Sequence, residues 1–293
     1  MTVTQRGIDL VIPAPRAHWV GQGFLVHGYI SRDPVLARKL SPFLLLDYQA
    51  PFVYPPTPYR RGVGAHPHRG FETVTLAFEG RIAHLDSTGM GGVIGPGDVQ
   101  WMTAGRGILH REYHETEFAR AGGRLHMAQV WVNLPAAHKM GEPRYQLLES
   151  REIAEVALPD RLGSVRVIAG EYAGVRGPAR TVTKVGMFEI RLCEGGRFSL
   201  DIDPNHTLAM LVMDGEVRVG DRACVRGDFV LFDHEGAGIV LESLAPATHL
   251  LMLTGEPIDE PLLQDGPFVM NTAREIRTAY ADFRAGHFGT LAP

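Results

Sequence analysis

The sequence has few lysines, few cysteines and no long apolar segment, and each scarcity argues against a class of protein. Of 29 basic residues in 293, three are lysines (Lys39, Lys139 and Lys184), and the net charge of −4 disfavours a globally basic nucleic-acid binder. The two cysteines, Cys193 and Cys224, are too few for a disulfide-stapled fold or, alone, for a structural zinc site. No apolar run approaches the roughly 20 residues of a membrane helix.

Targeting features are scarce as well. Residues 1–15 lack the basic start and apolar core of a secretory signal peptide. We therefore expect a cytoplasmic protein with no direct binding to membrane or nucleic acid. We also expect a monomer.

What the sequence has in abundance is glycine and proline, with 34 and 20 residues that follow no period. This composition favours many short elements joined by tight turns, and hence an all-β fold. A helix is predicted over Thr272–Arg284, where Thr272 and Glu275 form a capping box. A second, weak helix is predicted over Asp33–Lys39. Strand-length apolar runs lie at 24–29, 43–47, 72–78, 99–102, 127–134, 187–192, 208–213, 229–232 and 249–253.

The chain contains an internal repeat. The segment around Gly80 matches the segment around Gly215, since both are an apolar strand, an acid-Gly turn and another strand start. Downstream, the Gly-Asp pair at Gly97 matches the pair at Gly227. Two copies of this unit predict two small β-barrels in tandem. The best linker candidate is the segment 135–143.

Histidines and a glutamate concentrate in the first copy. His66 and His68 share one face of a predicted strand, and His110 and Glu112 share one face of another, because residues two apart on a strand point the same way. If the two strands face each other across a barrel, three nitrogens and one carboxylate converge. That ligand set suits iron(II), manganese, nickel, copper or zinc and leaves positions open for substrate and dioxygen.

These residues resemble the cupin superfamily and, more closely, the pirin family. The likeness lies in HPHRGFETV (66–74), GPGDVQWMTAGRGILH (95–110), PFLLLD (42–47), VWVNLP (130–135) and GPFVMNT (266–272). It implies two tandem cupin-type, jelly-roll barrels with a C-terminal α-helix. We expect a metal-binding N-terminal barrel over 1–137, and a metal-free C-terminal barrel with the terminal helix over 138–293.

The resemblance also implies the ligands. Carried over motif by motif, the pirin pattern gives His66, His68, His110 and Glu112, with Glu112 as the catalytic residue as well. In the general cupin pattern the glutamate after His-x-His is a ligand, which here would be Glu72; we favour Glu112. Iron(II) is the expected metal, with Mn, Ni, Cu, Co or Zn as alternatives.

The implied activity is that of a quercetin 2,3-dioxygenase. A flavonol-like aromatic substrate would coordinate the metal through its 3-hydroxyl, and Glu112 would take the proton as general base. Dioxygen would then open the ring with loss of carbon monoxide. The alternative is a non-catalytic regulatory protein whose metal state governs binding to a transcription factor or a metabolic enzyme.

The second copy lacks these ligands. Counting from the matched glycines places Asp201 and Asp203 at the first histidine pair, and Val240 and Glu242 at the second pair. Val240 cannot ligate, so we expect the C-terminal barrel to be metal-free. Three further histidines near the predicted site are expected to pack in the barrel wall or on the surface, although each could orient a ligand: His84, His114 and His126.

Overall fold

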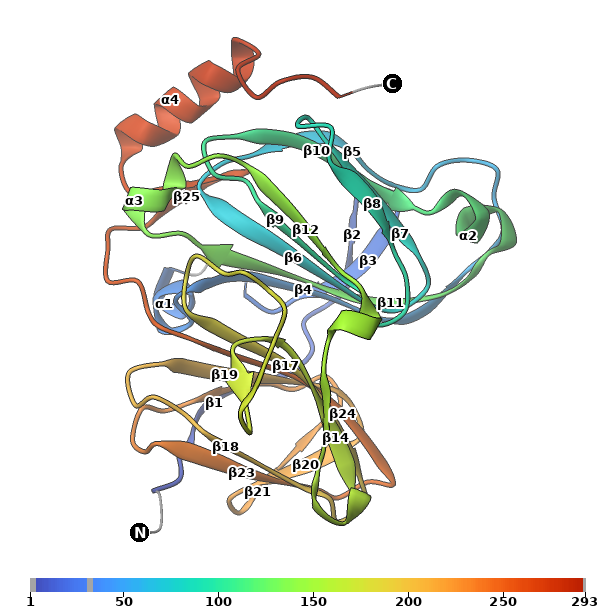
Figure 1. Cartoon of the computed structure of the whole chain (residues 1–293), viewed down its shortest axis with the longest axis vertical. Coiled ribbons are helices and arrows are strands. Elements are labelled where there is room, and N and C mark those ends of the chain that lie inside the picture. Colours follow the sequence, from blue (N-terminus) through green and yellow to red (C-terminus); the bar gives the residue numbers. More distant parts are fainter. Residues whose placement is uncertain (1–3, 31–33, 292–293) are drawn as a thin grey trace. The chain divides into compact units, whose positions relative to one another are not determined.

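A computed structural model describes residues 4–30 and 34–291 (Figure 1). The chain forms two compact units whose segments alternate along the sequence. The N-terminal barrel unit comprises Arg16–Ser31, Phe43–Ser150 and Ile258–Pro293. The C-terminal barrel unit comprises Met1–Pro15, Arg32–Pro42 and Arg151–Pro257.

The N-terminal barrel unit is built from two antiparallel sheets. One has the order β12-β9-β6-β11-β4-β3-β2 and the other the order β5-β10-β7-β8. The first sheet comprises β12 (Arg144–Leu148), β9 (Val99–Thr103), β6 (Phe71–Glu79), β11 (Gly123–Asn133), β4 (Phe43–Tyr54), β3 (Phe24–Gly28) and β2 (His18–Val20). The second comprises β5 (Gly62–His68), β10 (Ile108–His114), β7 (Ile82–Asp86) and β8 (Gly91–Ile94).

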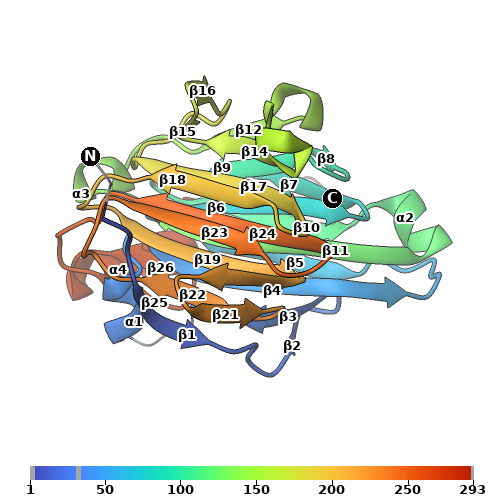
Figure 2. The ribbon, with the colours of Figure 1, turned by 90° about the horizontal axis from the view of Figure 1, so that it is seen from below.

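The C-terminal barrel unit repeats this arrangement, with sheets β1-β22-β19-β24-β17-β14-β13 and β18-β23-β20-β21 (Figure 2). Its first sheet comprises β1 (Ile8–Ile12), β22 (Phe229–Phe232), β19 (Thr207–Asp214), β24 (Ala247–Gly255), β17 (Val185–Cys193), β14 (Gly163–Ala169) and β13 (Glu155–Ala157). Its second comprises β18 (Arg197–Asp201), β23 (Gly238–Ser243), β20 (Glu216–Val219) and β21 (Arg222–Val225).

The matching strand orders confirm the predicted tandem repeat. The order β9-β6-β11-β4 in one unit corresponds to β22-β19-β24-β17 in the other, and β5-β10-β7-β8 corresponds to β18-β23-β20-β21. Gly80 and Gly215 occupy the same turn with φ of 83° and 79°, a backbone region that glycine adopts at little cost. The all-β, cupin-type fold expected from the sequence is therefore correct.

Helices are few and short. They are α1 (Pro34–Lys39), α2 (Thr116–Ala121), α3 (Ala136–Lys139) and α4 (Ala273–Arg284), with 3₁₀ turns at Ser150–Glu152 and Pro159–Arg161. Two small hairpins pair β15 (Glu171–Tyr172) with β16 (Val175–Arg176), and β25 (Leu263–Asp265) with β26 (Phe268–Met270). None of the helices within 4–30 and 34–291 is long and apolar enough to span a bilayer.

Both predicted helices form. The hydroxyl oxygen of Thr272 accepts from the backbone N–H of Glu275 at 3.2 Å and caps α4, while the Glu275 carboxylate accepts from the backbone N–H of Asn271 at 3.1 Å. Asp33, the first residue of the weaker predicted helix, lies outside the described residues.

No single boundary in the sequence separates the two units. Strand β1, near the start of the chain, pairs with β22 in the C-terminal barrel unit, and residues 258–293 belong to the N-terminal barrel unit. A cut at 137/138 would transfer these segments to the other barrel. The division into 1–137 and 138–293 stays a prediction about the sequence, and the structure is described below by its two units.

The interior of the C-terminal barrel is apolar, and this corrects the predicted match of ligand positions. Asp201, Asp203 and Val240 are exposed, so counting from the glycines selected residues on the outward face. Their strands turn Phe198, Leu200, Ile239 and Leu241 inward, and these four side chains belong to one buried core. A one-residue difference in count exchanges the faces of a strand, because side chains alternate with period two. The metal-free C-terminal barrel stays a prediction, now resting on these apolar residues.

Candidate metal centre

The two predicted ligand strands are neighbours. Strand β5 carries His66 and His68, β10 carries His110 and Glu112, and the two strands pair antiparallel with His110 opposite His66. The strands are thus neighbours in one sheet and do not face each other across the barrel. The imidazoles meet because cross-strand partners on one face of a sheet lie within about 5 Å of each other.

The three histidines form one compact group. Their candidate ligand nitrogens all lie within 4.8 Å of one another, and the ring centres of His66 and His110 are 4.2 Å apart. His68 and His110 are buried, and His66 is half-buried. Burial, followed by the neighbouring His66, lowers the pKa of both buried imidazoles well below the usual range for histidine. The neutral imidazole is the form that binds a metal.

The hydrogen bonds of the rings fit a metal in this group. Nδ1 of His66 lies 2.8 Å from the carbonyl oxygen of Gly64, and Nδ1 of His68 lies 3.3 Å from that of Pro267. A carbonyl only accepts, so each Nδ1 donates and each Nε2 keeps its lone pair. Nε2 of His110 is buried and has no hydrogen-bond partner in the described part of the chain. A first-row transition ion would satisfy these nitrogens.

Glu112 lies beside this group and belongs to a second one, which it forms with His110 and His84. Three side chains hold its carboxylate. Thr75 and Gln100 donate to Oε1 at 3.3 and 3.2 Å, and Gln129 donates to Oε2 at 3.0 Å. Glu112 thus offers a fixed carboxylate, held from three strands, next to the histidines.

Glu72, the alternative ligand, lies elsewhere. It is fully buried on β6 and belongs to neither group of candidate ligands. Thr103 donates to its Oε1 at 2.7 Å, and burial raises the pKa of its carboxyl. Glu72 is therefore a buried carboxyl group that packs within its sheet.

A pocket of about 190 Å³ opens beside the candidate ligands. Its lining includes His66, His68, Glu112 and Trp131. Asp47 on β4 also lines it, and burial raises the pKa of this carboxyl to about 6, partly offset by His18. Trp101, Met102 and Phe71 are fully buried in the core.

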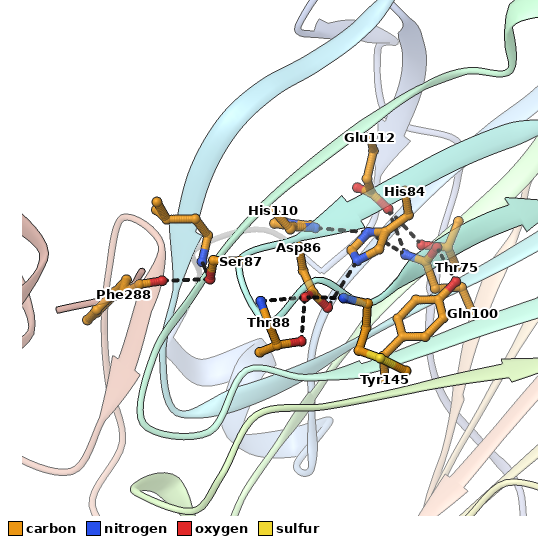
Figure 3. A network of polar contacts seen from close by, with 12 residues as sticks. Thr75, His84, Asp86, Ser87, Thr88, Gln100, His110, Glu112, Tyr145 and Phe288 are labelled. Carbon is orange, nitrogen blue, oxygen red and sulfur yellow. Dashed lines mark hydrogen bonds and ion pairs between the residues drawn. The ribbon is translucent and has the colours of Figure 1, made fainter. Parts of the chain in front are cut away.

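The sequence predicts that His84 packs in the barrel wall or on the surface, but His84 contacts a candidate ligand directly. Its Nδ1 lies 3.4 Å from Nδ1 of His110, and its ring stacks on that of Tyr145 (Figure 3). The spacing of His84 and Asp86, two apart on β7, could have indicated a pair on one face of a strand. His114 and His126 pack in the barrel wall, where they bond to the Gly23 carbonyl and to the Tyr48 hydroxyl.

The end of the chain contributes to the same region. Besides the bond from His68 to Pro267, Arg69 forms an ion pair with Asp282 on α4 at 2.9 Å. The Arg69 guanidinium lies over the ring of Phe288 at 4.7 Å, and the hydroxyl of Ser87 donates to the Phe288 carbonyl at 2.6 Å. Arg69, which follows the candidate ligand His68 in the sequence, and Ser87 therefore anchor the segment 258–291.

Comparisons with known proteins agree with this geometry. A family model described as Pirin matches residues 25–132, and one described as Pirin C-terminal cupin domain matches residues 187–289. The chain is 49% identical over 271 residues to a Pseudomonas aeruginosa protein named "Putative quercetin 2,3-dioxygenase PA2418", covering 92% of this chain and 94% of that one. It is 38% identical over 273 residues to human "Pirin", covering 90% and 88%.

A solved structure is similar over the whole chain. The crystal structure of quercetin 2,3-dioxygenase from Acinetobacter baumannii has a TM-score of 0.94 and 43% sequence identity. The match covers 99% of this chain and 100% of that chain. Fold and sequence thus point to the same group of proteins.

Proposed function

Since the chain belongs to the pirin family, we propose that it is a metal-dependent dioxygenase of the quercetin 2,3-dioxygenase type, with iron(II) as its metal and a flavonol as its substrate. The observation that carries the proposal is the histidine group, in which His66, His68 and His110 bring their ligand nitrogens within 4.8 Å beside a pocket. The names of the Pseudomonas and Acinetobacter proteins support the reaction type.

The three histidines would hold the metal and Glu112 would complete the set. When bound, the metal would act as a Lewis acid that favours ionisation of the flavonol 3-hydroxyl. The Glu112 carboxylate would accept that proton, and the amides of Gln100 and Gln129 would keep it oriented during the transfer. The ring of Trp131 in the pocket wall would exclude water from the reacting face.

The test is turnover by protein prepared without oxygen. Wild-type protein loaded anaerobically with Fe(II) is mixed with quercetin and then oxygen, and we follow the loss of quercetin and the release of carbon monoxide. His66→Ala removes one proposed ligand and should abolish both, whereas His126→Gln changes a buried histidine away from the group and should preserve them. Unchanged quercetin with Fe, Mn, Ni, Cu, Co and Zn alike would contradict the proposal.

One observation favours a second candidate function, that of a regulatory protein whose metal state controls a protein contact. The pocket of about 190 Å³ is smaller than the roughly 300–1,000 Å³ usual for a small-molecule site, so a flavonol would need the pocket to open. A pull-down from the native host distinguishes the two. An identified partner that wild-type protein captures and His66→Ala does not, without quercetin turnover, would favour regulation.

A further inference from the structure

The two ring nitrogens of His110 have different surroundings. Nε2 is buried and has no hydrogen-bond partner among the described residues, and Nδ1 lies 3.4 Å from Nδ1 of His84 (Figure 3). Two ring nitrogens this close share one hydrogen, so one ring donates and the other accepts. The direction of that bond decides which nitrogen of His110 can bind a metal.

Gln100 sets the direction. Its Nε2 lies 3.2 Å from Oε1 of Glu112 and 3.1 Å from Nδ1 of His84. A carboxylate only accepts, so the atom of Gln100 that faces it must be the amide NH₂, and the same NH₂ donates to His84. Nδ1 of His84 is therefore an acceptor. The hydrogen between the two histidines belongs to Nδ1 of His110, which leaves the lone pair on Nε2.

Asp86 adds one more residue to this series of polar side-chain contacts. With its Nδ1 accepting, neutral His84 carries its hydrogen on Nε2, which lies 3.7 Å from Oδ2 of Asp86. Both side chains are 0% exposed, and neither atom has a hydrogen-bond partner in the described ranges. At this distance the contact is an electrostatic one between an N–H and a carboxylate. The other oxygen of Asp86 accepts from Thr88 and from the backbone N–H of Met90, which fixes the carboxylate.

We infer that Asp86 and His84 are positioning residues that hold His110 in the tautomer whose Nε2 can bind the metal. The inference rests on the proposed metal centre, because it takes His110 to be a ligand. A ligand histidine usually donates its second N–H to a carboxylate, a carbonyl or water. Here that acceptor is a second histidine, whose ring is held by stacking on Tyr145 at 5.1 Å with an interplanar angle of 16°.

Asp86→Asn opposes the direction of the hydrogen bond between His84 and His110 with little change in the shape of the side chain. The amide oxygen would stay with the donors of Thr88 and Met90, and the amide NH₂ would then face Nε2 of His84. His84 would then accept at Nε2 and donate from Nδ1, with the NH₂ of Gln100 turning to Glu112 alone, so the hydrogen of His110 would shift towards Nε2. We expect the affinity of the apoprotein for Ni(II) and Fe(II) to fall by about 10- to 100-fold.

The experiment reads the tautomer and the affinity separately. Long-range ¹H–¹⁵N correlation spectra of the metal-free protein report which nitrogen of His110 is protonated, and titration calorimetry reports the affinity. Wild type should show Nδ1–H, and Asp86→Asn should show a gain of Nε2–H. Asp98→Asn, which changes another aspartate that accepts from backbone N–H groups in the same unit, should behave as wild type.

A second variant covers the case in which Asp86→Asn does not fold. His84→Phe keeps a ring against Tyr145 and should give mixed His110 tautomers with a smaller loss of affinity, because part of the population keeps the binding-competent tautomer. Nε2–H on His110 in the wild type, or wild-type affinity in the folded variants, would overturn the inference. If the proposed flavonol reaction fails instead, quercetin is unchanged while the tautomer and affinity differences persist, which still supports the positioning role.

Discussion

Nδ1 of His68 lies 3.3 Å from the carbonyl oxygen of Pro267, which is 199 positions further along the chain. A candidate metal ligand is thus oriented by a segment that lies far from it in the sequence. The adjacent Arg69, whose side chain is 4% exposed, pairs with Asp282 in the same segment.

Arg69→Met should loosen the C-terminal segment and weaken metal binding. The change removes the ion pair with Asp282 and the contact with Phe288, and we expect a loss of about 1–3 kcal/mol in the free energy of unfolding, since Asp282 is partly solvated. Hydrogen exchange over 258–291 should rise. The matched control is Arg120→Met, because Arg120 pairs with Glu117 on the surface and should cost at most about 0.5 kcal/mol. Unchanged exchange in Arg69→Met would show that the pair does not anchor the segment.

Glu112→Gln should retain much of the metal and lose turnover. The three histidine nitrogens remain, so metal content should stay near that of the wild type, whereas a neutral amide cannot accept the substrate proton. Its NH₂ would also oppose the amide of Gln100 or Gln129. Metal analysis and quercetin consumption measure the two effects. Turnover at the wild-type rate would exclude Glu112 as the base.

Asp47→Asn should stabilise the protein above pH 6 and leave it unchanged near pH 3. Burial raises the folded-state pKa of Asp47 to about 6 from an ordinary 3.8, so the folded protein binds the proton more tightly than the unfolded chain. The stability from this proton is fully present below pH 3.8 and is lost as the pH rises through 6. Allowing for its partial exposure, the gain at pH 8 should be about 1–2 kcal/mol by urea unfolding. An equal gain at both pH values would point to a cause other than ionisation.

Glu189→Gln should destabilise the C-terminal barrel at neutral pH. Burial alone would raise the pKa of Glu189, but bonds from His249 at 2.8 Å and Arg166 at 2.5 Å, with Arg191, lower it to about 2. The stabilisation is present above the ordinary pKa of 4.5 and is lost as the pH falls towards 2. We expect the variant's free energy of unfolding to be lower than that of the wild type by about 3 kcal/mol at pH 7, and this difference to vanish by pH 2. Glu242→Gln, at a more exposed pair with Arg197, should cost under about 1 kcal/mol.

Local patterns predicted the elements of this fold well. The apolar runs fall on strands, the capping box at Thr272 opens α4, and the matched turns at Gly80 and Gly215 identify two barrels of the same topology. These features depend on residues close in sequence, where backbone preference and side-chain alternation act directly. The resemblance to pirins added the expected ligands, and the structure brings the three histidines together.

Relations between distant residues were predicted less well. Spacing placed His66 and His110 on strands but left open whether those strands are neighbours, because register depends on the whole sheet. Counting from Gly215 selected Asp201 on the outward face for the same reason. The contacts of His84 with His110, and of His68 with Pro267, follow from tertiary packing and have no local pattern.

The hydrogen bond to Pro267 also has a consequence for biosynthesis. At roughly 5–20 residues per second, a ribosome adds Pro267 about 10–40 s after His68. Once His110 has been added, the nascent chain carries all three histidines for the rest of that interval without the carbonyl that orients one of them. We therefore expect the ion to be captured firmly only after Pro267 has been synthesised, so that insertion of the correct metal depends on the pool that the chain meets from that point on.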